Sequence, residues 1–144
     1  MTELTVAPLE PEQFDGLAWF LNAAGLPSSD LGDPGRTFYR IDAESLIGYA
    51  GLEGEGDDRL LRSVVVLHDR RRAGLGCPLV AAIEKEAREI GVRRLHLLTT
   101  TASGFFRAIG YLDADRVSAP SSIAASREFT ALCPASATYF VKVL

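Results

Sequence analysis

The chain of 144 residues contains few of the side chains that bind metals or form covalent crosslinks. Its two cysteines, Cys77 and Cys133, lack a CxxC spacing, and its two histidines, His68 and His96, are scattered. Because a structural metal site usually needs four such ligands at close spacing, we expect no metal. Two distant thiols also give no disulfide framework, and the sequence shows no export signal, so we expect reduced cysteines in the cytoplasm.

Long apolar runs and a general excess of positive charge are also missing. No stretch of about 18 apolar residues is present, which argues against a membrane-spanning helix. The net charge is −4, whereas a general nucleic-acid binder usually carries a positive excess over the whole domain. Residues 1–61 hold twelve acids and three arginines, and residues 62–144 hold seven acids and twelve lysines or arginines. A basic second half in an acidic chain indicates an anion-binding site there and no nucleic-acid partner.

The remaining composition fits one domain over residues 1–144, with 47% hydrophobic and 24% charged residues. Apolar periodicity predicts helices at four places: 10–24, 78–90, 101–109 and within 119–129. Apolar runs bounded by turn residues predict strands: 4–7, 37–41, 46–53, 60–67, 95–98, from 111, and 138–144. The central strand, helix and strand imply a right-handed βαβ unit with parallel strands. We therefore predict an α/β or α+β layer structure with a mixed sheet of six to seven strands and about four helices.

The strand predicted over 60–67 runs into a basic glycine turn, Arg71-Arg72-Ala73-Gly74-Leu75-Gly76, and then into a helix. Backbone N–H groups and the helix dipole at such a turn point toward one ligand, so this order of elements forms a cradle for a diphosphate. Arg71 and Arg72 add charge-assisted contacts. Gly74 and Gly76 let phosphate oxygens approach the backbone without a Cβ clash. The turn predicts a phosphate-bearing cofactor, and the alternative is an ordinary solvated loop.

A second motif follows one helix and one strand later: Phe105-Phe106-Arg107-Ala108-Ile109-Gly110-Tyr111. Together the two motifs resemble the signatures of the GCN5-related N-acetyltransferases, the GNAT family, and the resemblance covers essentially the whole chain. It implies the GNAT fold, with a mostly antiparallel sheet around a central parallel βαβ unit. It also implies acetyl-CoA as donor, a small-molecule amine as acceptor, and direct attack in a ternary complex. Segments 97–102 and 132–137 further resemble a small GNAT group encoded beside arsenic-resistance genes.

The resemblance implies that the coenzyme binds the turn and the strand before it. The pyrophosphate is expected at the backbone amides of Arg71, Arg72, Gly74, Gly76 and Cys77. Val64 to Val66 are expected to pair with the pantetheine arm. The N–H of Val66 is expected to polarise the thioester carbonyl, which is an oxyanion-type role.

Phe106 departs from the family pattern, in which a tyrosine is common at this position and protonates the leaving thiolate. Phe106 is expected to contact the coenzyme, but it has no proton to give. Because a coenzyme A thiol has a pKa near ~8.5, its thiolate is already a fair leaving group at neutral pH. Water or a hydroxyl of Thr99, Thr101 or Tyr111 is the alternative acid. The loss of the tyrosine also leaves open a second function, an acyl-CoA-binding sensor module without turnover.

Only a neutral amine attacks a thioester, so the predicted reaction needs a base. Glu53 or Glu55, next to the cofactor strand, is expected to take the proton, and the alternative is that both are ordinary turn carboxylates. Arg62 and Ser63 are expected on opposite faces of the strand, since side chains alternate. Arg62 is then either a clamp for the acceptor or the ion-pair partner of a neighbouring strand.

The acceptor site is expected to take further residues from both halves of the chain. Arg36 and Tyr39 follow an acidic loop and are expected to form the acceptor wall, as that region does in the family. Cys133 is a candidate for the same pocket, whereas His96 is expected to pack in the core. A homodimer through the terminal strand region would fit the family's habit.

Overall fold

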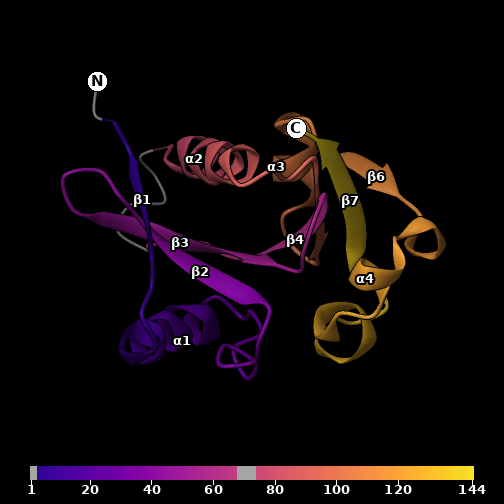
Figure 1. Ribbon diagram of the computed structural model, residues 1–144, viewed down its shortest axis with the longest axis horizontal. Helices are drawn as coiled ribbons and strands as arrows, with labels where there is room; N and C mark the ends of the chain where they lie inside the picture. Colours follow the sequence, from indigo (N-terminus) through magenta and orange to yellow (C-terminus); the bar gives the residue numbers. More distant parts are fainter. Residues whose placement is uncertain (1–2, 68–73) are drawn as a thin grey trace.

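The computed structural model describes residues 3–67 and 74–144, which form one seven-stranded sheet covered by helices on both faces (Figure 1). Neighbouring strands are antiparallel except for one parallel pair in the middle, β4 and β5. The strands lie in the order β1 (Thr5–Pro8), β2 (Arg36–Asp42), β3 (Leu46–Glu53), β4 (Asp58–Val66), β5 (Arg94–Thr99), β7 (Thr138–Val143) and β6 (Leu112–Ala114). The predicted mixed sheet and its parallel βαβ unit are therefore confirmed.

Four α-helices lie in the described part of the chain: α1 (Phe14–Ala23), α2 (Gly76–Glu89), α3 (Ser103–Ala108) and α4 (Ser121–Ala124). Helix α2 begins two residues earlier than predicted, because Pro78 is tolerated in a first helical turn. The helix predicted within 119–129 divides into α4 and a π-helical turn, Glu128–Leu132. No helix of residues 3–67 and 74–144 is long and apolar enough to cross a bilayer.

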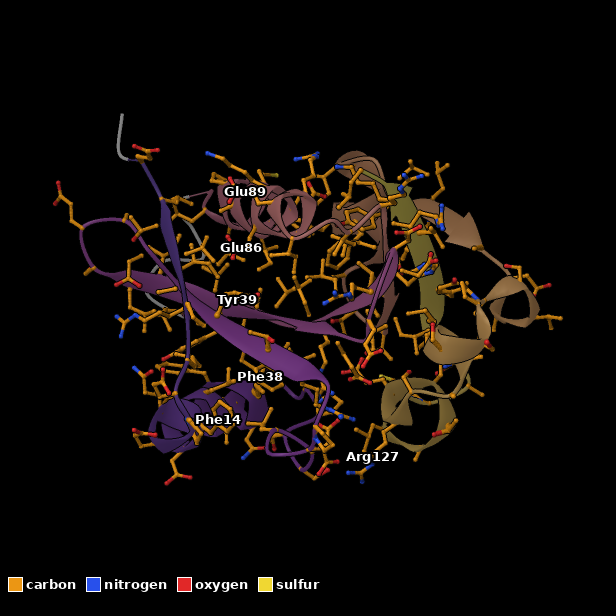
Figure 2. All side chains as sticks on the ribbon, in the orientation of Figure 1. Phe14, Phe38, Tyr39, Glu86, Glu89 and Arg127 are labelled. Carbon is orange, nitrogen blue, oxygen red and sulfur yellow. The ribbon has the colours of Figure 1, made fainter. Side chains whose placement is uncertain are left out.

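Helices α2 and α3 cover one face of the sheet, and α1 and α4 lie on the other (Figure 1). Alternation along β2 sends neighbouring side chains to these two faces. Phe38 packs edge-to-face on Phe14 of α1, with ring centroids 5.7 Å apart. Tyr39 belongs instead to the core beneath α2 (Figure 2). The face toward α1 is the one that carries the polar groups described below.

Strands β4 and β5 pair only at their first residues. Asp58 to Leu60 are paired with Arg94 to His96, and no further pair joins these two strands within the described residues. Strand β4 nevertheless stays paired with β3 up to Val66. The parallel strands therefore separate beyond Leu60, and the rest of the β4 edge borders an opening.

A bulge in β4 lies at the start of this opening. The β3–β4 register shifts between Tyr49 and Gly51, and Ser63 has a φ of 57°. A residue other than glycine in the left-handed region is uncommon and costs free energy. The bulge turns the Ser63 side chain out of the alternation expected for a regular strand.

Candidate active site

Two adjoining cavities fill the opening between β4 and β5. The larger has a volume of about 540 Å³ and is lined by β4, by the end of β5 with the residues after it, and by segments 23–27 and 132–134. The smaller has a volume of about 440 Å³ and lies beside the N-terminus of α2. They share Val64, Val66, Ala102 and Phe106. One cleft therefore leads from the helix N-terminus to the polar face of the sheet.

The smaller cavity contains part of the predicted phosphate cradle. Gly74, Gly76 and Cys77 line it, and Gly76 is the first residue of α2. The first amides of a helix have no intrahelical acceptor, so those of Gly76 and Cys77 are suited to an anion. Arg71 and Arg72 lie outside the described residues, as does His68.

The two glycines of the cradle are needed for different reasons. Gly74 has a φ of 70° and open space around it, so its role is conformational. A Cβ on Gly76 would lie 3.1 Å from the ring of Phe105. Gly76 therefore also makes room for the second aromatic motif, a packing reason that the prediction did not include.

The Val66 amide faces the opening. Leu67, directly after β4, donates its N–H to the carbonyl of Ile47 in β3, at 2.9 Å. Because successive amides of a strand point to opposite sides, the N–H of Val66 is directed toward the β5 side. Val66 and Val64 thus border the cleft, as expected for residues that pair with an inserted ligand.

Five buried charged side chains gather at the larger cavity, and we call them the Arg62 cluster: Asp30, Arg36, Glu53, Arg62 and Glu128. Arg62 donates from both terminal nitrogens to Asp30, at 2.5 and 2.7 Å, and from Nη1 to Glu53 at 2.9 Å. Its Nε lies 3.1 Å from Glu128 Oε2. Arg36 Nε lies 3.1 Å from Asp30 and 3.4 Å from Glu53. The cluster therefore joins three carboxylates to two guanidiniums.

Burial and this unequal count set the ionisation of the cluster. Burial opposes the charge of Arg62, but its bonds to Asp30 and the nearby carboxylates raise its pKa. Burial would raise the pKa of Asp30, yet Arg62 and Arg36 lower it. Burial raises the pKa of Glu128 to about 7; Arg62 opposes this rise, and Glu53 and Asp30 reinforce it. Within the cluster, the pKa of Glu128 is therefore raised, whereas that of Asp30 is lowered.

The expectation for Arg62 and Ser63 was wrong in one respect. Both residues line the larger cavity on the same side, and Arg62 Nε lies 3.3 Å from Ser63 Oγ, because the bulge breaks the alternation. The guanidinium of Arg62 is occupied by three carboxylates. The ion-pair alternative is therefore what the structure has, and Arg62 is not available as a clamp for an acceptor anion.

The glutamates expected as bases are poorly placed. Glu53 is held between Arg62 and Arg36, and it is not among the residues lining the larger cavity. Glu55 is exposed in the turn between β3 and β4. Glu128 does line the cavity and is only 4% exposed. The sequence offered no signal for Glu128, because its ion pair joins residues that lie 66 positions apart.

Neither Arg36 nor Tyr39, the residues expected to form the acceptor wall, lines the larger cavity. Tyr39 is buried beneath α2, on the opposite face of the sheet, so the expectation that it lines the acceptor site was wrong. Its neighbour Phe38 lies on the correct face, with the Arg62 guanidinium 5.6 Å from the ring centre. Arg36 reaches the site through the Arg62 cluster rather than through the cavity wall.

Of the side chains considered as proton donors to the leaving thiolate, some border the cleft and one does not. Phe106 is buried against Tyr111 and Phe140 and borders both cavities. Thr99 and Thr101 line the larger cavity. The Tyr111 hydroxyl, by contrast, donates to Glu84 Oε2 at 2.8 Å beneath α2. Tyr111 is therefore not a source of protons for the cleft.

Two further side chains behave as expected or nearly so. His96 is buried between the Tyr139 hydroxyl and the Asp58 carboxylate, at 2.6 and 2.7 Å, as expected for a core residue. Cys133 lines the larger cavity, and its thiol donates to Glu128 Oε1 at 3.7 Å. Burial and the nearby Glu128 raise the pKa of Cys133 to about 12, which disfavours a nucleophilic thiolate.

Across residues 3–67 and 74–144, no group of three or more His, Cys, Asp or Glu side chains could hold a metal ion.

Known proteins resemble the chain in sequence pattern and in fold. Residues 33–112 match the family model described as "Acetyltransferase (GNAT) domain". The whole chain superposes on N-acetylglutamate synthase from Neisseria gonorrhoeae, solved with coenzyme A and L-arginine, with a TM-score of 0.77 and 19% identity. It spans 34% of that longer protein. No curated protein matches the chain in sequence.

Two other structures match over nearly their whole length. A GNAT acetyltransferase from Staphylococcus aureus Mu50 has a TM-score of 0.75 at 15% identity, with 98% of this chain and 99% of that one covered. A spermidine N-acetyltransferase from Vibrio cholerae has a TM-score of 0.69 at 10% identity, with 98% and 94% covered. At these identities the likeness is one of fold. Because the family model covers more than half of the sequence, the chain belongs to the GNAT acetyltransferase family.

Proposed function

We propose that this protein is an acetyl-CoA-dependent N-acetyltransferase that acetylates the amine of a small molecule by direct attack in a ternary complex. The observation that carries the proposal is the cleft between β4 and β5. One end of this cleft is a helix N-terminus suited to a diphosphate, and the other is a buried cluster of carboxylates. A donor that carries phosphates and an acceptor that carries an amine match these two ends.

The residues of the cleft fit coenzyme A. The amides of Gly76 and Cys77, with the glycine conformation at Gly74, suit a pyrophosphate, and Arg71 and Arg72 keep their predicted phosphate role. The β4 edge at Val64 to Val66 suits an extended pantetheine arm. Acetyl-CoA would supply the acetyl group as a thioester. The Val66 N–H would donate to the thioester carbonyl, a role worth about 3–4 kcal/mol.

Phe106 limits the help that the protein gives to the leaving group. A positioned acid contributes roughly 10²–10⁴-fold to such a step, and the phenyl ring supplies none. Thr99 and Thr101 carry hydroxyls on the wall of the larger cavity and remain candidates for this role. The absence of a tyrosine affects the rate rather than the nature of the reaction, because the thiolate leaves readily.

The acceptor is a small molecule. A cavity of about 540 Å³ lies in the range of small-ligand sites. The resemblance to the group encoded beside arsenic-resistance genes makes arsenic-containing amino acids one class to include among the candidates. A homodimer stays a prediction; β7 lies between β5 and β6, so main-chain pairing between copies would use the edge strand β6.

Two measurements test the proposal. Titration calorimetry with acetyl-CoA and with CoA should show binding at physiological concentrations, and absence of binding to both would remove the assignment. Gly74→Val should weaken this binding at least tenfold, because a β-branched residue is strained at a φ of 70°. A control change, Gly16→Ala at an exposed position of α1, should leave the affinity for acetyl-CoA unaltered.

A thiol-release assay over alkylamines, polyamines, amino acids and arsenic-containing amino acids then separates the enzyme from the sensor. The sensor remains a second candidate because Phe106 replaces a proton donor. Turnover of any amine at a useful rate would exclude it. Binding of acetyl-CoA without release of thiol on any of these amines would favour it.

A further inference from the structure

Glu128 is a carboxylate with a fixed orientation at the wall of the larger cavity. It belongs to the π-helical turn that follows α4, and its side chain is almost completely buried. Its Oε2 lies 3.1 Å from Arg62 Nε, and its Oε1 accepts from the Cys133 thiol at 3.7 Å. A carboxylate oxygen can accept more than one hydrogen bond, so these contacts leave Glu128 able to accept from a ligand. The side chain is therefore held from two sides and can still accept a proton from a ligand in the cavity.

The surrounding charges leave Glu128 without full compensation. Asp30 and Glu53 each contact both arginines of the Arg62 cluster, whereas Glu128 contacts Arg62 alone. The groups with the largest effect on its pKa are Arg62 from β4, Glu53 from β3, Asp30 from the loop after α1, and Cys133 from the segment that follows it. When Glu128 is ionised, three carboxylates face two guanidiniums, which leaves one excess negative charge in the cluster.

This excess selects the charge of the acceptor. A protonated amine entering the larger cavity would supply the missing positive charge, whereas a carboxylate placed beside Glu128 would add to the excess. Each nitrogen of the Arg62 guanidinium already lies beside a carboxylate of the cluster, so its positive charge is compensated before a further carboxylate arrives. The amine end of the acceptor, rather than an acidic end, therefore belongs at Glu128.

We propose that Glu128 is the general base of this enzyme and binds the ammonium of an alkylamine acceptor before accepting its proton. The inference rests on the proposed acetyl transfer. The carboxylate of Glu128 takes one proton from the ammonium, and the neutral amine attacks the thioester carbonyl. A C–N bond forms as the C–S bond breaks, and the thiolate leaves with the electron pair. The nitrogen loses a second proton and the thiolate gains one, so the products are an amide and the free thiol.

The ionisation of Glu128 agrees with this role. A base that works at neutral pH is most effective when its own pKa lies near the working pH. Burial raises the pKa of Glu128 to about 7. Glu53, by contrast, is fixed by two arginines away from the cavity wall. Glu128 therefore takes over the role that the sequence suggested for Glu53.

The test compares the pH profiles of kcat/KM for Glu128→Gln, Glu128→Asp and Glu84→Gln, using the best amine found by thiol release. Glu84 is the matched control, because it is a buried glutamate on the opposite face. In the wild-type protein, kcat/KM should rise with pH around pH 7 as Glu128 loses its proton, and we call this rise the limb near pH 7. Glu128→Gln should lower kcat/KM at pH 7 by about 10²–10³-fold and remove this limb. Glu128→Asp should keep that limb with a smaller loss. Glu84→Gln should keep the limb even if the protein is less stable.

A second measurement does not depend on activity. Carbon-13 NMR of labelled glutamate side chains in the ligand-free protein should show one carboxyl that titrates near pH 7. That signal should be missing in Glu128→Gln and present in Glu84→Gln. Its absence from the wild-type protein would contradict the charge argument for Glu128.

The outcomes separate this inference from the proposed function. Turnover by Glu128→Gln with an unchanged limb would overturn the base and leave the acetyltransferase intact. Absence of turnover on every amine would overturn both, even if the carboxyl titrated near pH 7. Loss of the limb in Glu128→Gln, with its retention in Glu128→Asp, would establish the role.

Discussion

The two faces of the sheet each bury an ionic cluster, and the clusters differ in charge and surroundings. Beneath α2, Glu84 accepts from the Tyr111 hydroxyl at 2.8 Å and lies 3.0 Å from Lys142 Nζ. This Glu84 cluster pairs one carboxylate with one ammonium and does not line the larger cavity. On the other face, the Arg62 cluster sets three carboxylates against two guanidiniums and borders that cavity.

The comparison separates an ion pair whose charges are balanced from a cluster in which one carboxylate is not fully compensated. In the Glu84 cluster, the lysine also donates to the carbonyl of Ile109 at 2.9 Å, so its charge is satisfied within the fold. Burial and the neighbouring Glu84 raise the pKa of Tyr111 well above its usual range, so the phenol stays protonated. In the Arg62 cluster, the surplus carboxylate holds a proton that can exchange near neutral pH. Unequal charge, rather than burial alone, distinguishes the cluster that we propose as the acceptor end of the cleft.

Removing the central cation of the Arg62 cluster should have the largest effect on stability. Arg62→Met leaves three buried carboxylates without their main partner, and we expect a loss of about 3–5 kcal/mol in the free energy of unfolding. Lys142→Met is the matched change in the Glu84 cluster. It should cost less, because one carboxylate loses one partner and keeps Tyr111. Urea unfolding measures both, and equal losses would show that the two clusters are equivalent.

The pH dependence of stability should differ between the two faces. The folded protein holds a proton on Glu128 up to about pH 7, whereas an unfolded glutamate releases it near ~4.3. The contribution of Glu128 to stability is therefore fully present below pH ~4.3 and is lost as pH rises toward 7. The slope approaches ~1.4 kcal/mol per pH unit in that window.

Glu128→Gln tests this slope directly. The stability difference between wild type and variant should shift with pH between ~4.3 and 7 in favour of the variant, and should be constant above 7. Chemical unfolding at several pH values measures it. A difference that is constant over the whole range would contradict the raised pKa of Glu128.

Tyr111→Phe sharpens the comparison from the structural side. The change removes a hydrogen bond to a buried carboxylate, and we expect a loss of about 1.5–3 kcal/mol in unfolding free energy. Turnover should be unaffected at temperatures where the variant is folded, because Tyr111 does not border the cleft. A fall in kcat without a fall in stability would instead identify Tyr111 as an acid.

The smallest effect is expected at an exposed pair beside the Arg62 cluster. Arg127 Nη1 lies 2.9 Å from Asp33 Oδ2 and joins the segment before Glu128 to the loop after α1 (Figure 2). Asp33→Asn should change stability by less than about 1 kcal/mol, since exposed pairs contribute little. It should raise KM for the acceptor amine a few-fold, because these two segments flank the larger cavity.

The control is the equally exposed pair of Arg107 and Asp113, on α3 and β6. Asp113→Asn should have a similarly small effect on stability and no effect on KM. Steady-state kinetics at low and at high salt would compare the two variants. Identical KM values for both would show that the Asp33 contact is unrelated to acceptor binding.

The wall of the smaller cavity could be predicted because its residues lie in short contiguous segments. The turn through Gly74 and Gly76 and the Phe105-Phe106 motif each lie within one short segment. The acceptor end is built from single residues of separate segments, and chain order gives no measure of their distances. Tyr39 was assigned to the wrong face because one residue along a strand reverses direction. Ser63 was misplaced because the sequence carries no sign of the bulge.

Because β4 and β5 pair over only three residues, the sheet consists of two parts that are joined by few hydrogen bonds. Strands β1 to β4 form one part, and β5 to β7 form the other. A ligand bound between β4 and β5 beyond Leu60 would contact both parts of the sheet. Such a ligand would tie the two parts together, so occupancy should slow amide exchange along the facing edges of both strands. Coenzyme and acceptor would then both reduce amide exchange along the facing edges of β4 and β5.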